Sequence, residues 1–377
     1  MHWVVLSSQP SAVVRRHGRY LVADLRTPHR VLSTSVVNGG QVEHVRHLVN
    51  HQSCEGTGHD ERFRVITENG QEAYHDLVCR EIELPAHEAA IMGTAANMNY
   101  AATVSEQDGH IGVTAIVTAG VATNAVCAGD PATWRETPDG IVKVPAVAGT
   151  INTILLITVP VTPPTLSRLV VTMTEGKSAA LQRLAVPSCY SQDLATGTGT
   201  DQFCIAAPLD GGPPLTSASP HMKFGEVVGR TVRDATLEAL RWQNGLEPSY
   251  TRGVFHALGR YGLKEATIFD ELVDLLDAGD LDLLRRNSKA AFYEPMVGAA
   301  AHALAAVLDR VRHQTLPASV MPDAIVQHAA MLAASLAAQP HRWGEFRARL
   351  HAGGRFDAKP LVLAAIALGW SEKWRSI

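Results

Sequence analysis

The sequence changes character near residue 245, and this change most constrains how the chain can fold. Residues 1 to about 245 mix runs of β-branched residues with glycine-rich turns and short helical patterns. From about residue 250 the chain is rich in Ala, Leu and Arg at helical spacing, and strand patterns disappear. The length of 377 residues is enough for two or three domains. We therefore predict an α+β domain over residues 1–245 and an all-α region over residues 250–377.

Strand patterns dominate the first region. The runs that predict strands are 2–8, 11–16, 19–25, 29–36, 61–67, 77–84, 111–121, 151–159 and 201–207. Residues 111–121 alternate with period two, and residues 151–159 are apolar on both faces, which is typical of a central strand. Asn69-Gly70 indicates a turn between the runs at 61–67 and 77–84. Because strands outnumber helices, we expect a mixed or antiparallel sheet covered by helices.

Helical spacing interrupts these strands at a few places. Thr162-Pro163-Pro164 indicates an N-cap, and a helix is expected over 163–184. The β-branched residues at 170–172 also allow a short strand followed by a helix from Glu175. A short helix over 41–52 and a long one over 222–243 are expected as well. In the tail, helices are predicted near 250–259, 264–278, 295–313, 323–338, 340–351 and 360–370.

Composition excludes several classes of protein. The net charge is −4 and the pI is about 6.5, so we expect no nucleic-acid partner and no attraction to anionic lipid. No run of about 18 apolar residues occurs, so no membrane span is expected, and the N-terminus lacks the pattern of a secretory signal. The five cysteines are odd in number and include no Cys-x-x-Cys pair, which argues against a disulfide framework or a zinc ribbon. We expect a reduced, cytoplasmic protein.

Small polar residues gather where the predicted strands meet loops. Glycine lets the backbone approach a ligand, while Asn and Thr supply hydrogen-bond donors without the cost of burying a charge. This pattern suits an amide-rich ligand, although ordinary turn chemistry would also produce it. The clusters are 93–97, 118–124, 149–152, 174–177 and 195–201.

Two of these clusters invite a specific interpretation. The glycine-rich run 195–201 is no P-loop, because a strand follows it and no Lys-Ser or Lys-Thr pair ends it. Lys177 falls inside the apolar stripe of the helix expected over 163–184. A lysine in such a position pairs with a carboxylate, shifts its pKa, or extends its amine to solvent at a domain edge. Glu175 and Asp201 are the candidate partners.

Three histidines share one stripe of the helix expected over 41–52. His44, His47 and His51 have the spacing of zinc ligands with one open position. Three ligands from one short helix rarely converge on one ion, so we favour a partly buried polar face. The His-Glu-x-x-His and Gly-x-Ser-x-Gly motifs are absent, which argues against the commonest metalloproteases and serine hydrolases.

Four of the polar clusters, taken in order, resemble the motifs of the adenosylcobinamide amidohydrolases, the CbiZ family. The resemblance covers about residues 30 to 245 and leaves the helical tail outside. It departs mildly at Gly176, where alanine is expected. The matching segments are Thr118-Ala119-Gly120 with Asn124, Gly149-Thr150-Ile151-Asn152, Thr174-Glu175-Gly176-Lys177 and Thr196-Gly197-Thr198-Gly199-Thr200-Asp201.

The resemblance implies an enzyme of corrinoid salvage. Such enzymes hydrolyse the amide between the corrin ring and the aminopropanol arm of adenosylcobinamide, which gives adenosylcobyric acid and 1-amino-2-propanol for coenzyme B12 synthesis. No cofactor is firmly implied, since the substrate itself carries cobalt. A wide site with many Asn, Thr and glycine donors suits this amide-fringed ligand.

Amide hydrolysis suggests roles for the clustered residues. Our hypothesis is that Glu175 or Asp201 acts as base toward water, and that Lys177 stabilises charge or protonates the leaving amine. In a rival mechanism Thr150 or Thr198 is the nucleophile. The residues expected to bind substrate are Asn97, Thr118, Asn124, Thr150, Asn152, Thr196, Thr198 and Thr200.

Two other functions fit the same residues. One is a corrinoid-binding or delivery protein without hydrolytic activity, although the Asp-x-His-x-x-Gly pattern of base-off B12 carriers is absent. The other is an amidohydrolase of a different amide. The Ala- and Leu-rich tail suggests a homodimer.

Overall fold

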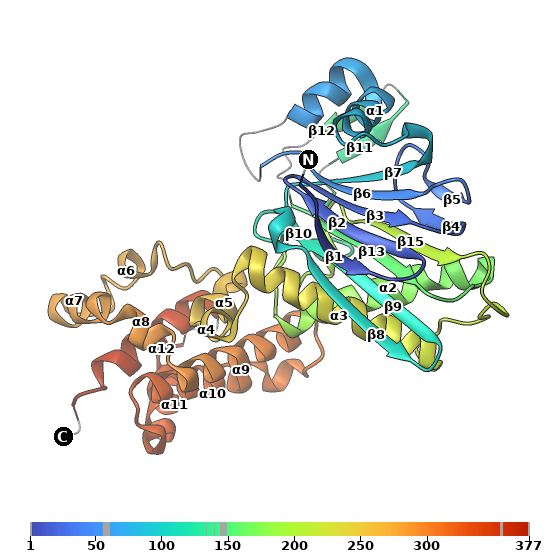
Figure 1. The fold of residues 1–377 in the computed structure, drawn as a ribbon. Coiled ribbons are helices and arrows are strands. Elements are labelled where there is room, and N and C mark those ends of the chain that lie inside the picture. Colours follow the sequence, from blue (N-terminus) through green and yellow to red (C-terminus); the bar gives the residue numbers. More distant parts are fainter. Residues whose placement is uncertain are drawn as a thin grey trace. The chain divides into compact units, whose positions relative to one another are not determined.

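The computed structural model describes residues 2–55, 61–132, 134–138, 140–143, 149–354 and 357–375. The chain divides into two compact units, Met1–Leu246 and Glu247–Ile377. The first unit holds the strands and three long helices, and the second is helical (Figure 1). The predicted α+β fold with a helical C-terminal region is confirmed.

A five-stranded sheet runs in the order β1-β2-β3-β6-β7. Its pairs are antiparallel except for the parallel pair β6–β7. The strands are β1 (Val4–Ser8), β2 (Ala12–His17), β3 (Tyr20–Leu25), β6 (His47–Gln52) and β7 (Ala89–Thr94).

A six-stranded sheet runs in the order β5-β4-β15-β13-β9-β8. It is antiparallel apart from the central parallel pair β13–β15. The strands are β4 (His29–Ser33), β5 (Gly40–Val42), β8 (Ala102–Asp108), β9 (Ile111–Ala119), β13 (Ile151–Ile157) and β15 (Gln202–Pro208). The predicted central strand is therefore one of two that lie side by side in the middle of this sheet.

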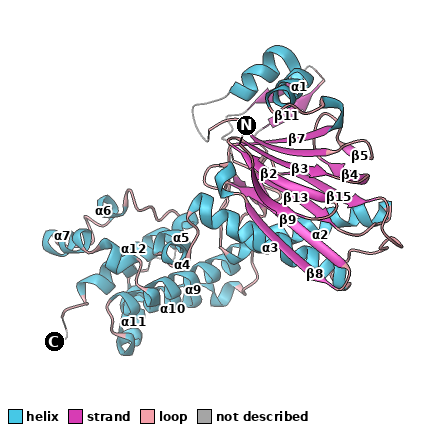
Figure 2. Ribbon diagram, in the orientation of Figure 1, coloured by secondary structure: helices cyan, strands magenta, loops and turns pink. Residues whose placement is uncertain are grey.

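The two sheets pack face to face and helices cover their outer faces (Figure 2). In β3, Leu21 and Ala23 point between the sheets while Val22 points toward helix α1 (Glu61–Glu81). In β13, Ile154 points between the sheets and Leu155 toward the opposite helices. Period-two alternation with both faces buried thus produces four layers.

Helices α2 (Pro163–Arg183) and α3 (Lys223–Asn244) cover the six-stranded sheet. The hydroxyl of Thr162 accepts a hydrogen bond from the backbone N–H of Thr165, which caps α2 as predicted. One continuous helix forms, so the alternative of a strand followed by a helix from Glu175 is wrong. Gly245 ends α3 in the left-handed conformation.

Two predictions in the first unit are wrong. Residues 41–52 form β5 and β6 instead of a helix, because Leu48 and Val49 are both buried, one on each face of the strand. The two strands predicted at 61–67 and 77–84 are replaced by α1, which ends at Glu81, because the buried residues Tyr74 and Val78, with Ile82 just after the helix, recur at helical spacing. Gly70 adopts φ 86° and ψ 172°, which kinks this helix and does not form a hairpin turn.

Short elements complete the first unit. Two small antiparallel ladders pair β10 (Ala125–Val126) with β14 (Gly197–Thr198), and β11 (Trp134–Thr137) with β12 (Gly140–Lys143). The 3-10 turns in the described parts of both units are Ala86–Glu88, Met98–Tyr100, Gly259–Tyr261, Ala318–Val320 and Pro340–Arg342.

The second unit has its own apolar core, which includes Phe292, Phe346 and Trp370. Its helices are α4 (Pro248–Thr251), α5 (Val254–Leu258), α6 (Ile268–Glu271), α7 (Ala278–Arg286), α8 (Ser288–Phe292), α9 (Pro295–Arg312), α10 (Met321–Leu336), α11 (Trp343–Ala352) and α12 (Ala358–Ser371). The single helix predicted over 264–278 is wrong: Asp277 caps α7, which begins a new helix there. Among the described residues, no helix combines the length and the apolar character needed to cross a bilayer.

Candidate active site

Most of the clustered polar residues meet at one edge of the two sheets. The parallel strands β13 and β15 begin there, with Asn152 opposite Gln202. Strand β9 ends at the same edge, where Thr118 lies opposite Asn152. The end of β7 joins them from the other sheet, because the Asn152 Nδ2 group donates to the Gly93 carbonyl at 3.2 Å.

A lysine–aspartate pair lies at this edge. Lys177 on α2 donates from Nζ to Oδ2 of Asp201, just before β15. The Asp201 carboxylate also accepts the backbone N–H groups of Ile151 at 3.0 Å and Thr198 at 3.1–3.2 Å, and the Thr198 hydroxyl at 2.5 Å. The predicted lysine therefore has a carboxylate partner, and backbone donors fix the orientation of that carboxylate.

The glycines of the run 195–201 make this close packing possible. A Cβ at Gly197 would lie 2.5 Å from Oδ2 of Asp201 and 2.8 Å from Nζ of Lys177. A Cβ at Gly199 would lie 3.1 Å from Oδ1 of Asn124. The run thus lets the backbone approach the charged pair and Asn124 closely.

A pocket of about 160 Å³ opens beside the pair. Its lining includes Lys177 and Asp201, whose side chains are 15% and 19% exposed, so both ionised groups can be reached from solvent. Of the described residues that line it, Asp201 is the one carboxylate and Lys177 the one cation. The lining residues are Ile151, Thr153, Met173, Thr174, Lys177, Asp201, Gln202 and Phe203.

Asn124 belongs to a second polar cluster in the neighbouring loops. Its amide donates to the Gly149 carbonyl at 2.8 Å, and its Oδ1 accepts the Tyr190 hydroxyl at 2.8 Å. The Thr200 hydroxyl donates to the same Gly149 carbonyl at 2.9 Å. Tyr190 lies in the Ser188–Asp193 loop, and no local sequence pattern singled it out.

Two of the expected substrate-binding residues are buried between the sheets. The Asn152 amide donates to Oδ1 of Asn50 at 2.9 Å, and the Asn50 amide donates to the Thr118 hydroxyl at 2.8 Å. Asn152 is fully buried, and Thr118 is 1% exposed. This network joins β6, β9 and β13, so these side chains stabilise the packing of the two sheets at this edge. Sequence patterns did not single out Asn50 as a member of the network.

The other residues expected to bind substrate form hydrogen bonds within and between the loops. The Thr150 hydroxyl donates to the Thr200 carbonyl at 2.6 Å. The Thr196 hydroxyl accepts the backbone N–H of Ala128 at 2.9 Å, between the strands β10 and β14. Asn97 caps a 3-10 turn, and its backbone N–H donates to the Gln243 side chain at 2.9 Å.

Glu175 lies apart from the Lys177–Asp201 pair. It is exposed on α2, and among the described residues it has no hydrogen-bond or ion-pair partner. Residues two apart on a helix point in different directions, so Glu175 does not accompany Lys177 into the pocket. The structure therefore brings together Lys177, Asp201 and Thr198.

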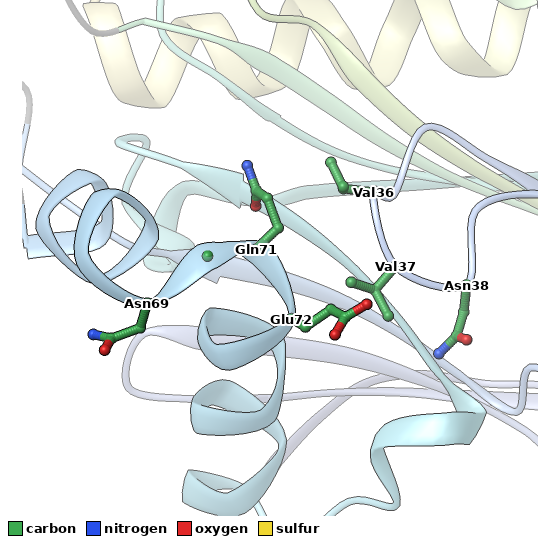
Figure 3. Close-up of a pocket in the computed structure, with 7 residues that line it drawn as sticks. Val36, Val37, Asn38, Asn69, Gln71 and Glu72 are labelled. Carbon is green, nitrogen blue, oxygen red and sulfur yellow. The ribbon is translucent and has the colours of Figure 1, made fainter.

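Two further pockets lie past Gln202, and the one that Gln202 lines has a volume of about 20 Å³. One pocket lies between the loop after β4 and α1, and its lining includes Arg62, Tyr74, Gly93 and Gln202. A larger pocket, of about 480 Å³, shares Val36, Val37 and Gln71 with it (Figure 3). Figure 3 shows Val36, Val37 and Asn38 on a loop that faces Asn69, Gln71 and Glu72 of α1.

The three histidines do not form a metal site. His47 and His51 lie four residues apart on β6, which at about 3.3 Å per residue separates them by about 13 Å. The Nδ1 atom of His47 bonds Asp24 at 2.8 Å, that of His51 bonds the Tyr74 hydroxyl at 2.7 Å, and His44 lies in the loop before the strand. Within the described part of the chain, no group of three or more His, Cys, Asp or Glu residues is arranged to hold an ion. The zinc hypothesis fails because its helix does not form.

Comparison with known proteins bears on this site. The model of the adenosylcobinamide amidohydrolase family, CbiZ, matches residues 6–248. The chain belongs to the CbiZ family. The match extends from within β1 through β15 and includes α1, α2 and α3, and so it covers every site residue described above.

Two other similarities add less about the activity. An uncharacterized protein of Methanocaldococcus jannaschii is 31% identical over 183 residues, which are 46% of this chain and 71% of that protein. The crystal structure of the PH0078 protein from Pyrococcus horikoshii aligns with a TM-score of 0.31 at 11% identity, over 63% of this chain and 82% of that one.

Proposed function

We propose that this CbiZ protein hydrolyses the amide that joins the aminopropanol arm to the corrin ring of adenosylcobinamide. The products are adenosylcobyric acid and 1-amino-2-propanol. The observation that carries the proposal is the Lys177–Asp201 pair in an open pocket of a chain that belongs to this family. In an amide hydrolase a carboxylate of this kind can take a proton from water while a nearby cation stabilises the developing charge.

In this mechanism Asp201 is the general base. The carboxylate reaches the pocket, while the N–H groups of Thr198 and Ile151 hold it in one orientation. It takes one proton from the attacking water and passes that proton to the leaving amine nitrogen as the C–N bond breaks. Lys177 stabilises the negative charge on the reacting amide and supplies the positive end of the pair.

Thr198 offers a second route to the same products. Its hydroxyl already donates to Asp201 at 2.5 Å, which is the arrangement of a nucleophile beside its base. Direct attack would form an ester between Thr198 and the corrinoid acid. Intact-protein mass spectrometry during turnover separates the two routes, because only this one adds the corrinoid mass to the chain.

Mass spectrometry of the small molecules tests the function itself. Purified protein is incubated with adenosylcobinamide, and both products are quantified. Equal amounts of 1-amino-2-propanol and adenosylcobyric acid are expected. Tight binding without release of either product would instead show a corrinoid-binding protein, and hydrolysis of other amides alone would show a different substrate.

A further inference from the structure

Arg62 is a cation in the pocket next to the Lys177–Asp201 pair, and no residue that the structure describes pairs with it. It comes from the first turn of α1 and lines the pocket that contains Tyr74, Gly93 and Gln202. Its Nε atom is buried and has no hydrogen-bond partner. Among the described residues no carboxylate or carbonyl pairs with its guanidinium, and a partly buried charge without a partner is costly in a protein that binds nothing there.

Two ring side chains that interact with Arg62, those of Tyr74 and His51, do not neutralise its charge. The guanidinium lies 5.4 Å from the centre of the Tyr74 ring. Burial raises the pKa of Tyr74 to about 12, so the phenol stays uncharged at neutral pH. Burial, together with the charges of Arg62 and Arg19, lowers the pKa of His51 to about 3, so that ring stays neutral too. The pocket therefore keeps a net positive centre.

Gly93 and Gln202 shape the pocket around the guanidinium. A Cβ at Gly93 would lie 2.1 Å from Nη1 of Arg62, so the arginine occupies the space that a side chain would fill. The Gly93 N–H donates to Oε1 of Gln202 at 2.9 Å, and among the described residues the Gln202 amide nitrogen has no acceptor. Gln202 lines both this pocket and the one that holds Lys177 and Asp201.

We infer that Arg62 and Gln202 form an oxyanion-binding subsite for the ring-side half of the substrate. This inference rests on the proposed function. Hydrolysis of the amide with water gives a carboxylate on the ring side and an ammonium on the released arm. Lys177 is already paired with Asp201, whereas the guanidinium of Arg62, to which no described residue is hydrogen-bonded, is a planar fork that matches a carboxylate. The subsite binds the carboxylate of the ring-side product once the amide is cleaved, while Lys177 stabilises the charge on the amide during the reaction.

Binding of two matched corrinoids tests the subsite. The ligands are adenosylcobyric acid and the corrinoid that carries a primary amide in place of its carboxylate. Affinities are measured by titration calorimetry for the wild type and Arg62→Met, with Arg80→Met as the control because Arg80 is an exposed arginine of the same helix. We expect Arg62→Met to weaken binding of the acid about tenfold or more, with a much smaller effect on the amide.

A second variant keeps the charge and moves it. Gly93→Ala places a methyl group where Nη1 of Arg62 lies, so the flexible guanidinium must leave its position. It should also reduce the preference for the acid, while Arg80→Met preserves that preference. Equal losses for acid and amide in Arg62→Met, or an unchanged preference in both Arg62→Met and Gly93→Ala, would overturn the inference.

Inorganic phosphate separates this inference from the proposed function. The thermal midpoint is followed with increasing phosphate at constant ionic strength. The wild type and Arg80→Met should rise in midpoint, and Arg62→Met should not, whether or not the chain binds any corrinoid. If no corrinoid binds the wild type, the proposed function fails, and the phosphate result alone decides the oxyanion site. A midpoint that does not rise in the wild type, or rises equally in Arg62→Met, overturns it.

Discussion

At the scale of single residues, the carboxylate of Asp201 is the most strongly positioned group in the pocket. Two backbone N–H groups, one hydroxyl and the Lys177 amine donate to its two oxygens. Such a carboxylate has little freedom to rotate, so a water molecule beside it meets the same acceptor in each turnover. The chemistry proposed here depends on that orientation and on the charge of Lys177.

Replacing Lys177 with Met should therefore slow hydrolysis without preventing binding. We expect kcat for adenosylcobinamide to fall roughly a hundredfold, because the charge that stabilises the reacting amide is lost. Steady-state kinetics and a binding titration measure the two effects separately. Lys223→Met is the control, since Lys223 is an exposed lysine of α3 that pairs with Glu226. A Lys177→Met enzyme as fast as the control would remove Lys177 from the mechanism.

His51 gives the fold a dependence on pH. Burial lowers its pKa from about 6.5 in the unfolded chain to about 3 in the fold. The unfolded chain therefore binds one more proton between these pH values, so stability is full above pH 6.5 and falls as the pH drops toward 3. At pH 5 the contribution of His51 is a loss of about 2 kcal/mol.

Urea unfolding at pH 7 and pH 5 measures this loss. His51→Gln cannot titrate in this range and can still accept the Tyr74 hydroxyl. Its free energy of unfolding should change less between the two pH values than that of the wild type. The same change in both proteins would show that His51 is not the group responsible.

At the scale of elements, the network of Asn50, Asn152 and Thr118 fixes where the strands begin and end. It lies in a layer that is otherwise apolar, between Leu48 and Met92 of one sheet and Ile116 and Ile154 of the other. Buried polar groups of this kind stabilise only when all are paired. Their pairing sets the register that brings Gly93, Ile151 and Asp201 to one edge.

Asn152→Ala should consequently destabilise the first unit. Loss of its amide leaves the Asn50 Oδ1 and the Gly93 carbonyl without a donor, at a cost of about 1–3 kcal/mol in the free energy of unfolding. Asn99→Ala is the control, because Asn99 is exposed. Denaturant titrations that show no difference between the two variants would contradict the structural role of the network.

Sequence patterns predicted correctly those elements whose caps, prolines and apolar spacing all lie within the element itself. Helix α2 was predictable because its cap, its prolines and its apolar spacing agree. Strand β6 was not, since three histidines at helical spacing lie in a segment whose partners, β3 and β7, are distant in sequence. In α1 the Asn69-Gly70 pair suggested a hairpin, but the burial of Tyr74 and Val78 against the sheet decided the structure.

The same distinction applies to the site. Lys177, Asp201 and the glycine-rich run could be singled out, because pairing with a carboxylate is one of the ways in which a lysine is accommodated in an apolar stripe, and Asp201 was one of two candidate partners. Asn50, Arg62 and Tyr190 could not, because each acts through contacts with residues far along the chain. A short sequence motif cannot predict contacts between residues that are far apart in the chain.

At the scale of the whole molecule, the site residues and the family match belong to the first unit. The match covers residues 6–248, and the first compact unit ends at Leu246. Each unit has its own buried core. We expect residues 1–246 alone to fold and to hydrolyse adenosylcobinamide with a kcat within about threefold of the full chain.

The helical second unit would then have a role in oligomerisation and none in catalysis. If it forms the homodimer proposed from its composition, light scattering should give a dimer for the full chain and a monomer for residues 1–246.

Cooperative thermal unfolding of the shorter chain shows that it is folded. A folded 1–246 chain without activity would place part of the function in the second unit.

The central claim is that Asp201 is the base of an adenosylcobinamide hydrolase. It is tested most directly by release of 1-amino-2-propanol from adenosylcobinamide by the wild type and by Asp201→Asn, which keeps an acceptor oxygen and loses the charge. The wild type should release equal amounts of 1-amino-2-propanol and adenosylcobyric acid, and Asp201→Asn should bind the substrate but release product at least about a hundredfold more slowly. A wild type that binds without release, or an Asp201→Asn variant that turns over at the wild-type rate, would contradict it.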